Sequence, residues 1–333
     1  MNFSKGGEAL AAREIMELVQ EDLRQVEREI DLESMASVSA VTTISRYLSR
    51  NGGKRLRPIL LLLSARLVGD VNPGAIHLGA VVEMIHTATL VHDDIIDLAE
   101  TRRGKPSTNI LFGNHTSVLA GDWLYMQAFQ IALRERNFHV LDILIALTQM
   151  MVEGELIQLE RIGKIDVSET DYMELVDRKT AGLFSACARL GAVIAGGSDE
   201  MEARLADFAW NLGMAFQLID DVLDFTAEES VLGKPVGGDL REGKVTLPLV
   251  YALEKCSVNE RAMVEQVLRE RSYDNVRFAD VLEMITRREG IARARERANS
   301  FAAKSRAMIH EFPDSPYQRA MVSVAELVIE RTF

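Results

Sequence analysis

The chain has 333 residues, with 38 Lys and Arg against 50 Asp and Glu, so its formal net charge is 38 − 50 = −12. Because 47% of the residues are hydrophobic, the chain can bury a substantial core, which argues against an intrinsically disordered protein. The acidic balance argues against nucleic acid or an anionic membrane surface as the main partner, since both are bound through Lys and Arg. Cys187 and Cys256 lie far apart without zinc-binding spacing, which favours a reducing compartment.

The N-terminal segment carries charges early and lacks the apolar core of a secretory signal. The apolar stretches 59–68 and 183–195 are each interrupted by an arginine and fall short of the roughly 20 residues that a bilayer requires. We therefore expect a cytoplasmic protein without a transmembrane segment.

Long helices are predicted along the whole chain, because the seven prolines fall at segment edges and leave long proline-free runs. Within 75–96 the apolar residues recur with helical spacing and without the alternation of a strand. The same pattern predicts helices over 117–136, 139–161, 169–195, 201–225 and 318–331. Several are apolar nearly all round, no convincing strand is found and linkers are short. We expect one all-α domain over 1–333, a single bundle of ten or more helices.

One acidic pattern occurs twice near the C-terminal ends of predicted helices, as DDIID at 93–97 and DDVLD at 220–224. Residues four apart share a helical face, so the first and last aspartates of each motif can point together. Like charges so placed repel, and the helix macrodipole disfavours anions at a C-terminus, so a cation is expected to offset the cost. Mg²⁺ is the hard, oxygen-seeking candidate. One motif alone would more simply be a solvated helix end, whereas two copies on apolar helices favour a shared interior cleft.

Basic loops accompany these motifs. In 51–58 (NGGKRLRP), two glycines let backbone N–H groups approach an anion, Lys54 and Arg57 add positive charge, and Pro58 can begin a helix at its first position. A basic surface turn explains this loop equally well. Further basic loops follow the two acidic motifs, at 101–106 and 233–244. The second contains GxxxxGK, but Val245 stands where a P-loop needs Ser or Thr, which argues against a nucleoside triphosphatase.

Two magnesium sites, several cations and an apolar helical interior describe a pocket for a diphosphate with a hydrocarbon tail. From about Gly52 to Pro248 the sequence resembles the trans-isoprenyl diphosphate synthases. The matching features, in the order of that family, are Gly-Gly-Lys-x-x-Arg-Pro at 52–58, the first acidic motif followed by Arg102-Arg103-Gly104, Lys179-Thr180, Gln217, the second acidic motif, and Gly-Lys-Pro through Lys244.

This resemblance implies a helical bundle around a central cavity and assigns a role to individual residues. Those expected to hold isopentenyl diphosphate are Lys54, Arg57, His86 and Arg103. Those expected to hold the allylic diphosphate are Arg102, Lys179, Lys234 and Lys244. Three Mg²⁺ ions are expected, two on Asp93 and Asp97 and one on Asp220, with indirect help from Asp94, Asp221 and Asp224. Thr180 and Gln217 would face the carbocation, and the departing diphosphate would take the proton.

The side chains one turn above the first acidic motif, Ala88 and Thr89, predict the product length. Family members that stop at fifteen carbons commonly carry aromatic rings at these positions, so a tunnel for the growing chain is expected to be open here. On the following helix Tyr125, Met126 and Phe129 are candidates for closing it, although helical spacing by itself favours core packing for Met126 and Phe129. We expect a product of about octaprenyl length, built from farnesyl diphosphate as a quinone side-chain precursor.

Three alternatives stay open: a geranylgeranyl synthase, a non-catalytic subunit of a heteromeric prenyl synthase, and a terpene cyclase on a similar fold. The cyclase has no need for the Gly-Gly-Lys loop, and non-catalytic subunits lose an acidic motif that this chain keeps. By resemblance we also expect a homodimer, with transient membrane contact for release of the hydrophobic product.

Overall fold

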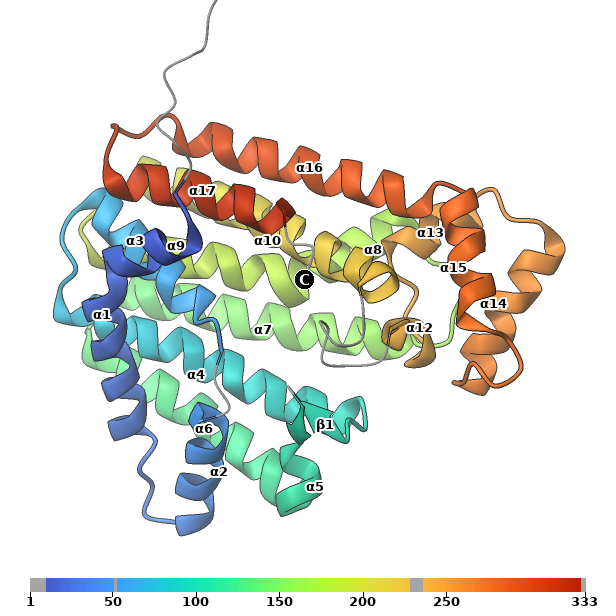
Figure 1. The fold of residues 1–333 in the computed structure, drawn as a ribbon. Coiled ribbons are helices and arrows are strands. Elements are labelled where there is room, and N and C mark those ends of the chain that lie inside the picture. The colour runs from blue at the N-terminus through green and yellow to red at the C-terminus, as the bar shows by residue number, and fades with distance from the viewer. Residues whose placement is uncertain (1–9, 51–52, 103, 228–235, 331–333) are drawn as a thin grey trace, which may run out of the picture. The chain divides into compact units, whose positions relative to one another are not determined.

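The computed structural model describes residues 10–50, 53–102, 104–227 and 236–330 (Figure 1). More than ten α-helices lie within these ranges, which confirms the predicted all-α fold. The strands of the described part, β1 (Thr101–Arg102) and β2 (Lys105–Pro106), form one antiparallel hairpin. The expectation of no strand was wrong at this point, because strands of two residues are too short to show an alternating pattern.

The helices of the N-terminal half are α1 (Ala12–Glu33), α2 (Ser39–Arg50), α3 (Leu56–Val68), α4 (Pro73–Ile96), α5 (Thr108–Phe112), α6 (Asn114–Arg134) and α7 (Phe138–Arg161). Those that follow are α8 (Glu169–Val176), α9 (Gly182–Ile194), α10 (Asp199–Thr226), α12 (Gly238–Arg241), α13 (Leu247–Leu253), α14 (Val258–Glu270), α15 (Phe278–Arg287), α16 (Gly290–Ile309) and α17 (Pro316–Glu330). The helix predicted over 169–195 is interrupted by a π-helical turn, η1 (Asp177–Ala181), between α8 and α9.

Helix α4 shows how the sequence specifies these elements. The side chain of Asn72 caps its N-terminus by accepting the N–H of Ala75, and Pro73 occupies the first turn. Its length and composition would allow it to cross a membrane, contrary to the expectation from the sequence. However, 72% of its most apolar window is buried inside the protein. Helix α4 is therefore a core helix of the protein.

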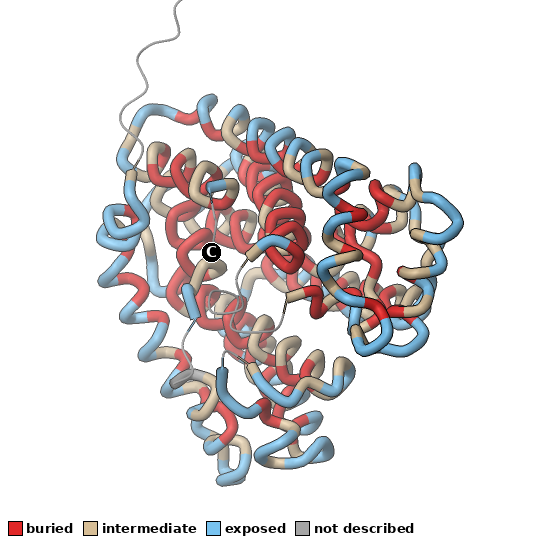
Figure 2. Tube along the Cα trace, turned by 45° about the vertical axis from the view of Figure 1, so that its right-hand side comes forward, coloured by how far each residue is buried: buried red, intermediate tan, exposed pale blue. Residues whose placement is uncertain are grey.

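Contacts divide the chain into two compact units, each assembled from three stretches. Unit 1 comprises 1–147, 183–209 and 306–324, and unit 2 comprises 148–182, 210–305 and 325–333. In unit 1, α4 packs against α1, α3 and α6; in unit 2, α13 packs against α8 and α15. Figure 2 shows some helices buried along most of their length and others on which buried and exposed residues alternate. A single domain over 1–333 stays a prediction.

Candidate active site

The first acidic motif lies in unit 1, at the C-terminal end of α4, where the chain turns back on itself. Asp97 is the C-cap, and Leu98 is left-handed with a φ of 53°. The N–H of Ala99 donates to the carbonyl of Asp94 at 2.9 Å, as in a Schellman turn. This turn and the β1–β2 hairpin return Arg102 to the helix, where its Nε donates to Oδ1 of Asp94 at 2.6 Å.

The three aspartates of this motif differ in exposure. Asp94 is only 1% exposed, whereas Asp93 and Asp97 are half-buried. Burial raises the pKa of Asp94, and the neighbouring Arg102 guanidinium opposes that shift. Asp94 thus holds a cation of the protein, and Asp93 and Asp97 are the carboxylates of this motif with access to solvent.

A cavity of about 30 Å³ lies beside the ion pair of Asp94 and Arg102. His86 lines it, so the structure brings together two of the predicted diphosphate ligands, His86 and Arg102. Arg55 and Glu83 also line this cavity, although the sequence had not singled them out. The signal for Glu83 was present, because it is the one charged residue of α4 before the acidic motif.

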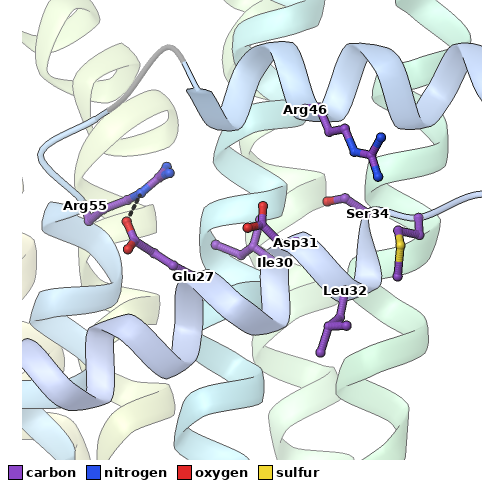
Figure 3. Close-up of a pocket in the computed structure, with 8 residues that line it drawn as sticks. Glu27, Ile30, Asp31, Leu32, Ser34, Arg46 and Arg55 are labelled. Atoms are coloured by element: carbon purple, nitrogen blue, oxygen red, sulfur yellow. Dashed lines mark ion pairs between the residues drawn. The ribbon is translucent and has the colours of Figure 1, made fainter.

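Arg55 joins three parts of unit 1. It immediately precedes α3 with a left-handed φ of 51°. Its guanidinium lies 2.7 Å from the buried carboxylate of Glu83 on α4 and 3.5 Å from that of Glu27 on α1. Figure 3 shows the pair with Glu27 at the edge of a larger cavity of about 470 Å³, which Arg46 lines from α2. These ion pairs anchor the start of α3, between Lys54, which precedes the helix, and Arg57 in its first turn.

Lys54 is exposed, and Arg57 lies in the first turn of α3 with its guanidinium 5.5 Å from the ring centroid of Phe184. Helix α3 begins at Leu56, so Pro58 is its third residue and not its first, as the sequence had indicated. Two predicted diphosphate ligands, Arg103 and Lys234, lie outside the described residues.

The predicted tunnel wall lies where α4 packs against α6. Ala88 is fully buried, whereas Thr89 is half-buried and donates its hydroxyl to the carbonyl of His86 at 2.7 Å. Next to the acidic motif the ring of His92 stacks on Tyr125 with centroids 6.0 Å apart. A substituent at Gly121 would clash with His92, so this glycine permits the close approach of the two helices.

The candidates for closing the tunnel are not equivalent. Tyr125 lies close to the first acidic motif, where its ring stacks on His92. Burial and the negative charge of Asp93 raise the pKa of Tyr125. Phe129 is half-buried one turn further along α6. Met126 is 65% exposed, which contradicts core packing, because the buried face of α6 is formed by residues such as Leu124 and Ala128.

The second acidic motif lies in unit 2, near the C-terminal end of α10, and its side chains are mostly engaged with protein groups. Asp220 is half-buried, but Asp221 and Asp224 are 3% and 1% exposed. Oδ2 of Asp224 accepts the N–H of Asp239, in the first turn of α12, at 3.2 Å. Burial, followed by the charge of Asp239, raises the pKa of Asp221.

A chain of hydrogen bonds connects Asp221 to two residues predicted to face the carbocation. The hydroxyl of Tyr172 donates to Oδ2 of Asp221 at 2.6 Å, and the amide of Gln217 donates to Oδ1 at 2.8 Å. Oε1 of Gln217 accepts the hydroxyl of Thr180 at 2.8 Å. The structure thus brings together Thr180, Gln217 and Asp221, and it adds Tyr172, which the sequence had not singled out.

Two of the predicted diphosphate ligands in unit 2, Lys179 and Lys244, are held by nearby acceptors. Lys179, in the π-helical turn, forms an ion pair with Glu155 and donates to Oε1 of Gln158 at 3.1 Å, both on α7. Lys244 pairs with Glu242 at 2.8 Å. A diphosphate would have to replace these carboxylates as the partner of each ammonium group.

The donor set fits Mg²⁺, although nowhere in the described ranges do three His, Cys, Asp or Glu side chains come together as ligands. Mg²⁺ is usually held by one or two carboxylates together with substrate phosphates, and not by an all-protein cage. Asp93 and Asp97, one turn apart and half-buried, suit that mode, as does Asp220. Bound there, the metal would supply positive charge to a diphosphate leaving group.

The family model described as Polyprenyl synthetase matches residues 38–285. The octaprenyl diphosphate synthase of Haemophilus influenzae is 36% identical over 329 residues, which cover 99% of this chain and 100% of that relative. The geranylgeranyl diphosphate synthase of Sulfolobus acidocaldarius is 42% identical over 235 residues, covering 68% of this chain and 71% of the relative.

Among solved structures, a polyprenyl synthase from Caulobacter crescentus, complexed with calcium and isoprenyl diphosphate, superposes with a TM-score of 0.92 at 34% identity. That superposition covers 98% of this chain and 99% of the other. Together with the two aspartate motifs and the Arg and Lys side chains that accompany them, these likenesses show that the chain belongs to the polyprenyl synthetase family and is a trans-polyprenyl diphosphate synthase.

Proposed function

We propose that the enzyme adds isopentenyl diphosphate units to farnesyl diphosphate and releases a product of about octaprenyl length for quinone side chains. The allylic C–O bond breaks and its electron pair leaves with the diphosphate. The isopentenyl double bond then forms the new C–C bond, and the diphosphate takes the proton that is lost. The observation that supports this proposal is that Asp94 holds Arg102, while Asp93 and Asp97 lie half-buried one turn apart on α4, in the arrangement that Mg²⁺ would require.

The binding residues divide between the substrates. Arg102, Lys179, Lys234 and Lys244 hold the allylic diphosphate, and Lys54, Arg57, His86 and Arg103 hold isopentenyl diphosphate. Three Mg²⁺ ions would be held here, two by Asp93 and Asp97 and one by Asp220, and would supply positive charge to the diphosphate. Thr180 and Gln217 face the allylic cation, and their oxygen dipoles stabilise its charge.

The product length rests on the small side chains Ala88 and Thr89. A longer hydrocarbon is expected to fit beside α4, because neither of the two residues one turn above the first acidic motif on this helix carries an aromatic ring. A geranylgeranyl product is the alternative, favoured by the likeness to the Sulfolobus enzyme. Because Ala88 is fully buried, a ring at this position would also disturb the packing of α4. Thr89→Phe, at a half-buried position, is therefore measured beside Ala88→Phe.

The protein acts in the cytoplasm as a homodimer and touches the membrane transiently when its product leaves. An exposed apolar stripe along one face of α7 supports the homodimer, formed by Phe138, Ile145, Val152, Leu156 and Leu159. Phe138 is 81% exposed and Leu156 58%. Exposing large apolar side chains in a continuous stripe to water is unfavourable, so such a stripe commonly marks a protein–protein interface. Sedimentation of the wild type and of Leu156→Glu tests this, and a monomeric wild type contradicts it.

Incubation with Mg²⁺, farnesyl diphosphate and labelled isopentenyl diphosphate, followed by sizing of the products, tests the reaction and the length together. We expect products near C40, and shorter ones from Ala88→Phe or Thr89→Phe. Products that stop at C20 would support the geranylgeranyl alternative. No chain extension would contradict the synthase, and unchanged lengths in both variants would contradict the tunnel.

A further inference from the structure

The hydrogen-bond chain of unit 2 has a direction. Tyr172, on α8, is buried, and its hydroxyl donates to Asp221, which is also buried, on α10. Asp221 accepts at both of its oxygens, from Tyr172 at Oδ2 and from the amide nitrogen of Gln217 at Oδ1, so Gln217 turns its NH₂ group toward Asp221 and its oxygen toward Thr180. The hydroxyl of Thr180 must therefore donate its proton to Gln217, and the lone pairs of Thr180 Oγ1 are directed elsewhere.

That direction decides the sign of the dipole that Thr180 presents. With its proton committed to Gln217, the hydroxyl offers oxygen lone pairs to a developing positive charge. A reversed chain would offer the proton and would oppose ionisation of the allylic C–O bond, in which the electron pair leaves with the diphosphate. The orientation of the Gln217 amide is therefore a requirement of the chemistry.

We propose that Tyr172 is a positioning residue that fixes this direction, an inference that rests on the proposed role of Thr180. Its hydroxyl donates a hydrogen bond to Oδ2 of Asp221, and this bond keeps the carboxyl group from rotating away from Gln217. Tyr172 and Thr180 lie eight residues apart, on either side of the start of the π-helical turn.

A second contact holds the start of this turn on the same helix. The indole Nε1 of Trp210, on α10, donates to Oδ1 of Asp177 at 2.6 Å, and Asp177 is the first residue of the turn. Helix α10 thus contacts the segment both before and at the start of the π-helical turn. The geometry of Thr180 depends on α10 as well as on its own helix.

Tyr172→Phe tests the proposal, because it removes the hydroxyl and keeps the ring. We expect kcat to fall about tenfold while the KM for each diphosphate stays within about twofold, since no substrate contact is lost. Tyr251→Phe is the matched control: Tyr251 is also buried in unit 2, on α13, and its hydroxyl pairs with Glu169. It should leave kcat unchanged.

A double-mutant cycle separates this role from a general loss of packing. Thr180→Val removes the hydroxyl at the far end of the chain and should itself lower kcat. In that background Tyr172→Phe should change kcat by less than about twofold, because the pathway is already broken. Asp221→Asn, measured at saturating Mg²⁺, gives the same test should Tyr172→Phe fail to fold.

Each outcome of the cycle has one interpretation. A full tenfold loss from Tyr172→Phe in the Thr180→Val background would overturn the proposal and leave the role of Thr180 intact. Wild-type kcat in Tyr172→Phe would also overturn it. Wild-type kcat in Thr180→Val would overturn the proposed role of Thr180, and with it this inference.

Discussion

The two acidic motifs have the same spacing but use their carboxylates differently. In the first, the middle aspartate is buried against Arg102, and the outer two are half-buried one turn apart. In the second, only Asp220 is half-buried, because Asp221 accepts from Tyr172 and Gln217 and Asp224 accepts from the backbone of Asp239. Motifs with identical spacing on a helix thus differ in exposure: two carboxylates of the first motif and one of the second are half-buried.

The largest effect is expected at the first motif. Asp93→Asn should lower kcat/KM by about a thousandfold, or about 4 kcal/mol of transition-state stabilisation, because it removes a carboxylate that would hold Mg²⁺. Steady-state assays across a Mg²⁺ titration measure this. Asp142→Asn, at an exposed position of α7, is the control and should behave as wild type. Activity of Asp93→Asn within tenfold of wild type would contradict a metal role.

The last aspartates of the motifs should separate activity from stability. Asp97→Asn should lower kcat about a hundredfold and leave the free energy of unfolding within about 0.5 kcal/mol, because its side chain is half-buried. Asp224→Asn should cost about 1–3 kcal/mol of unfolding free energy, because it perturbs a buried acceptor of the Asp239 N–H, and should lower kcat tenfold or less.

Urea denaturation and steady-state kinetics on both variants measure these two effects. If Asp97→Asn and Asp224→Asn lose activity and stability in the same proportion, the two motifs are equivalent and the distinction drawn from their burial is wrong.

The smallest effect is expected from the counterion of Lys179. Arg102 is held by its own motif, whereas Lys179 is held by Glu155 on α7. Glu155→Gln removes a competing anion, so the KM for the allylic diphosphate should fall about threefold with little change in kcat. Glu160→Gln, exposed one turn further along α7, is the control. A higher KM would instead mean that Glu155 orients Lys179 for binding.

Sequence periodicity predicted the long helices well, as for 75–96, which is α4 (Pro73–Ile96). It did not reveal the π-helical turn η1 within the helical segment 169–195, because such a turn adds one residue without changing the apolar character of the segment. It also placed Met126 in the core, whereas neighbouring helices bury a different face of α6. Periodicity shows that a helix has an apolar face and does not show what covers it.

Among the candidate site residues, the sequence points to those whose chemistry is visible in a local pattern, such as the paired aspartates and Lys179-Thr180. It did not identify Arg55, Glu83 or Tyr172, because their partners lie 28, 28 and 49 residues away in the chain. Glu83 and Arg55 are each other's partners, and Tyr172 contacts Asp221. Such pairs exist only once separate helices pack together.

The sequence by itself determined the reaction class, because the carboxylate spacing and the basic loops are short-range features that a single helix or turn can carry. Only the tertiary structure decided which aspartates keep access to solvent and which way the Gln217 amide turns. Burial and hydrogen-bond direction depend on which donors α8, the β1–β2 hairpin and α12 bring to each carboxylate. Those donors are contributed by residues outside the motifs, so the motif spacing does not encode them.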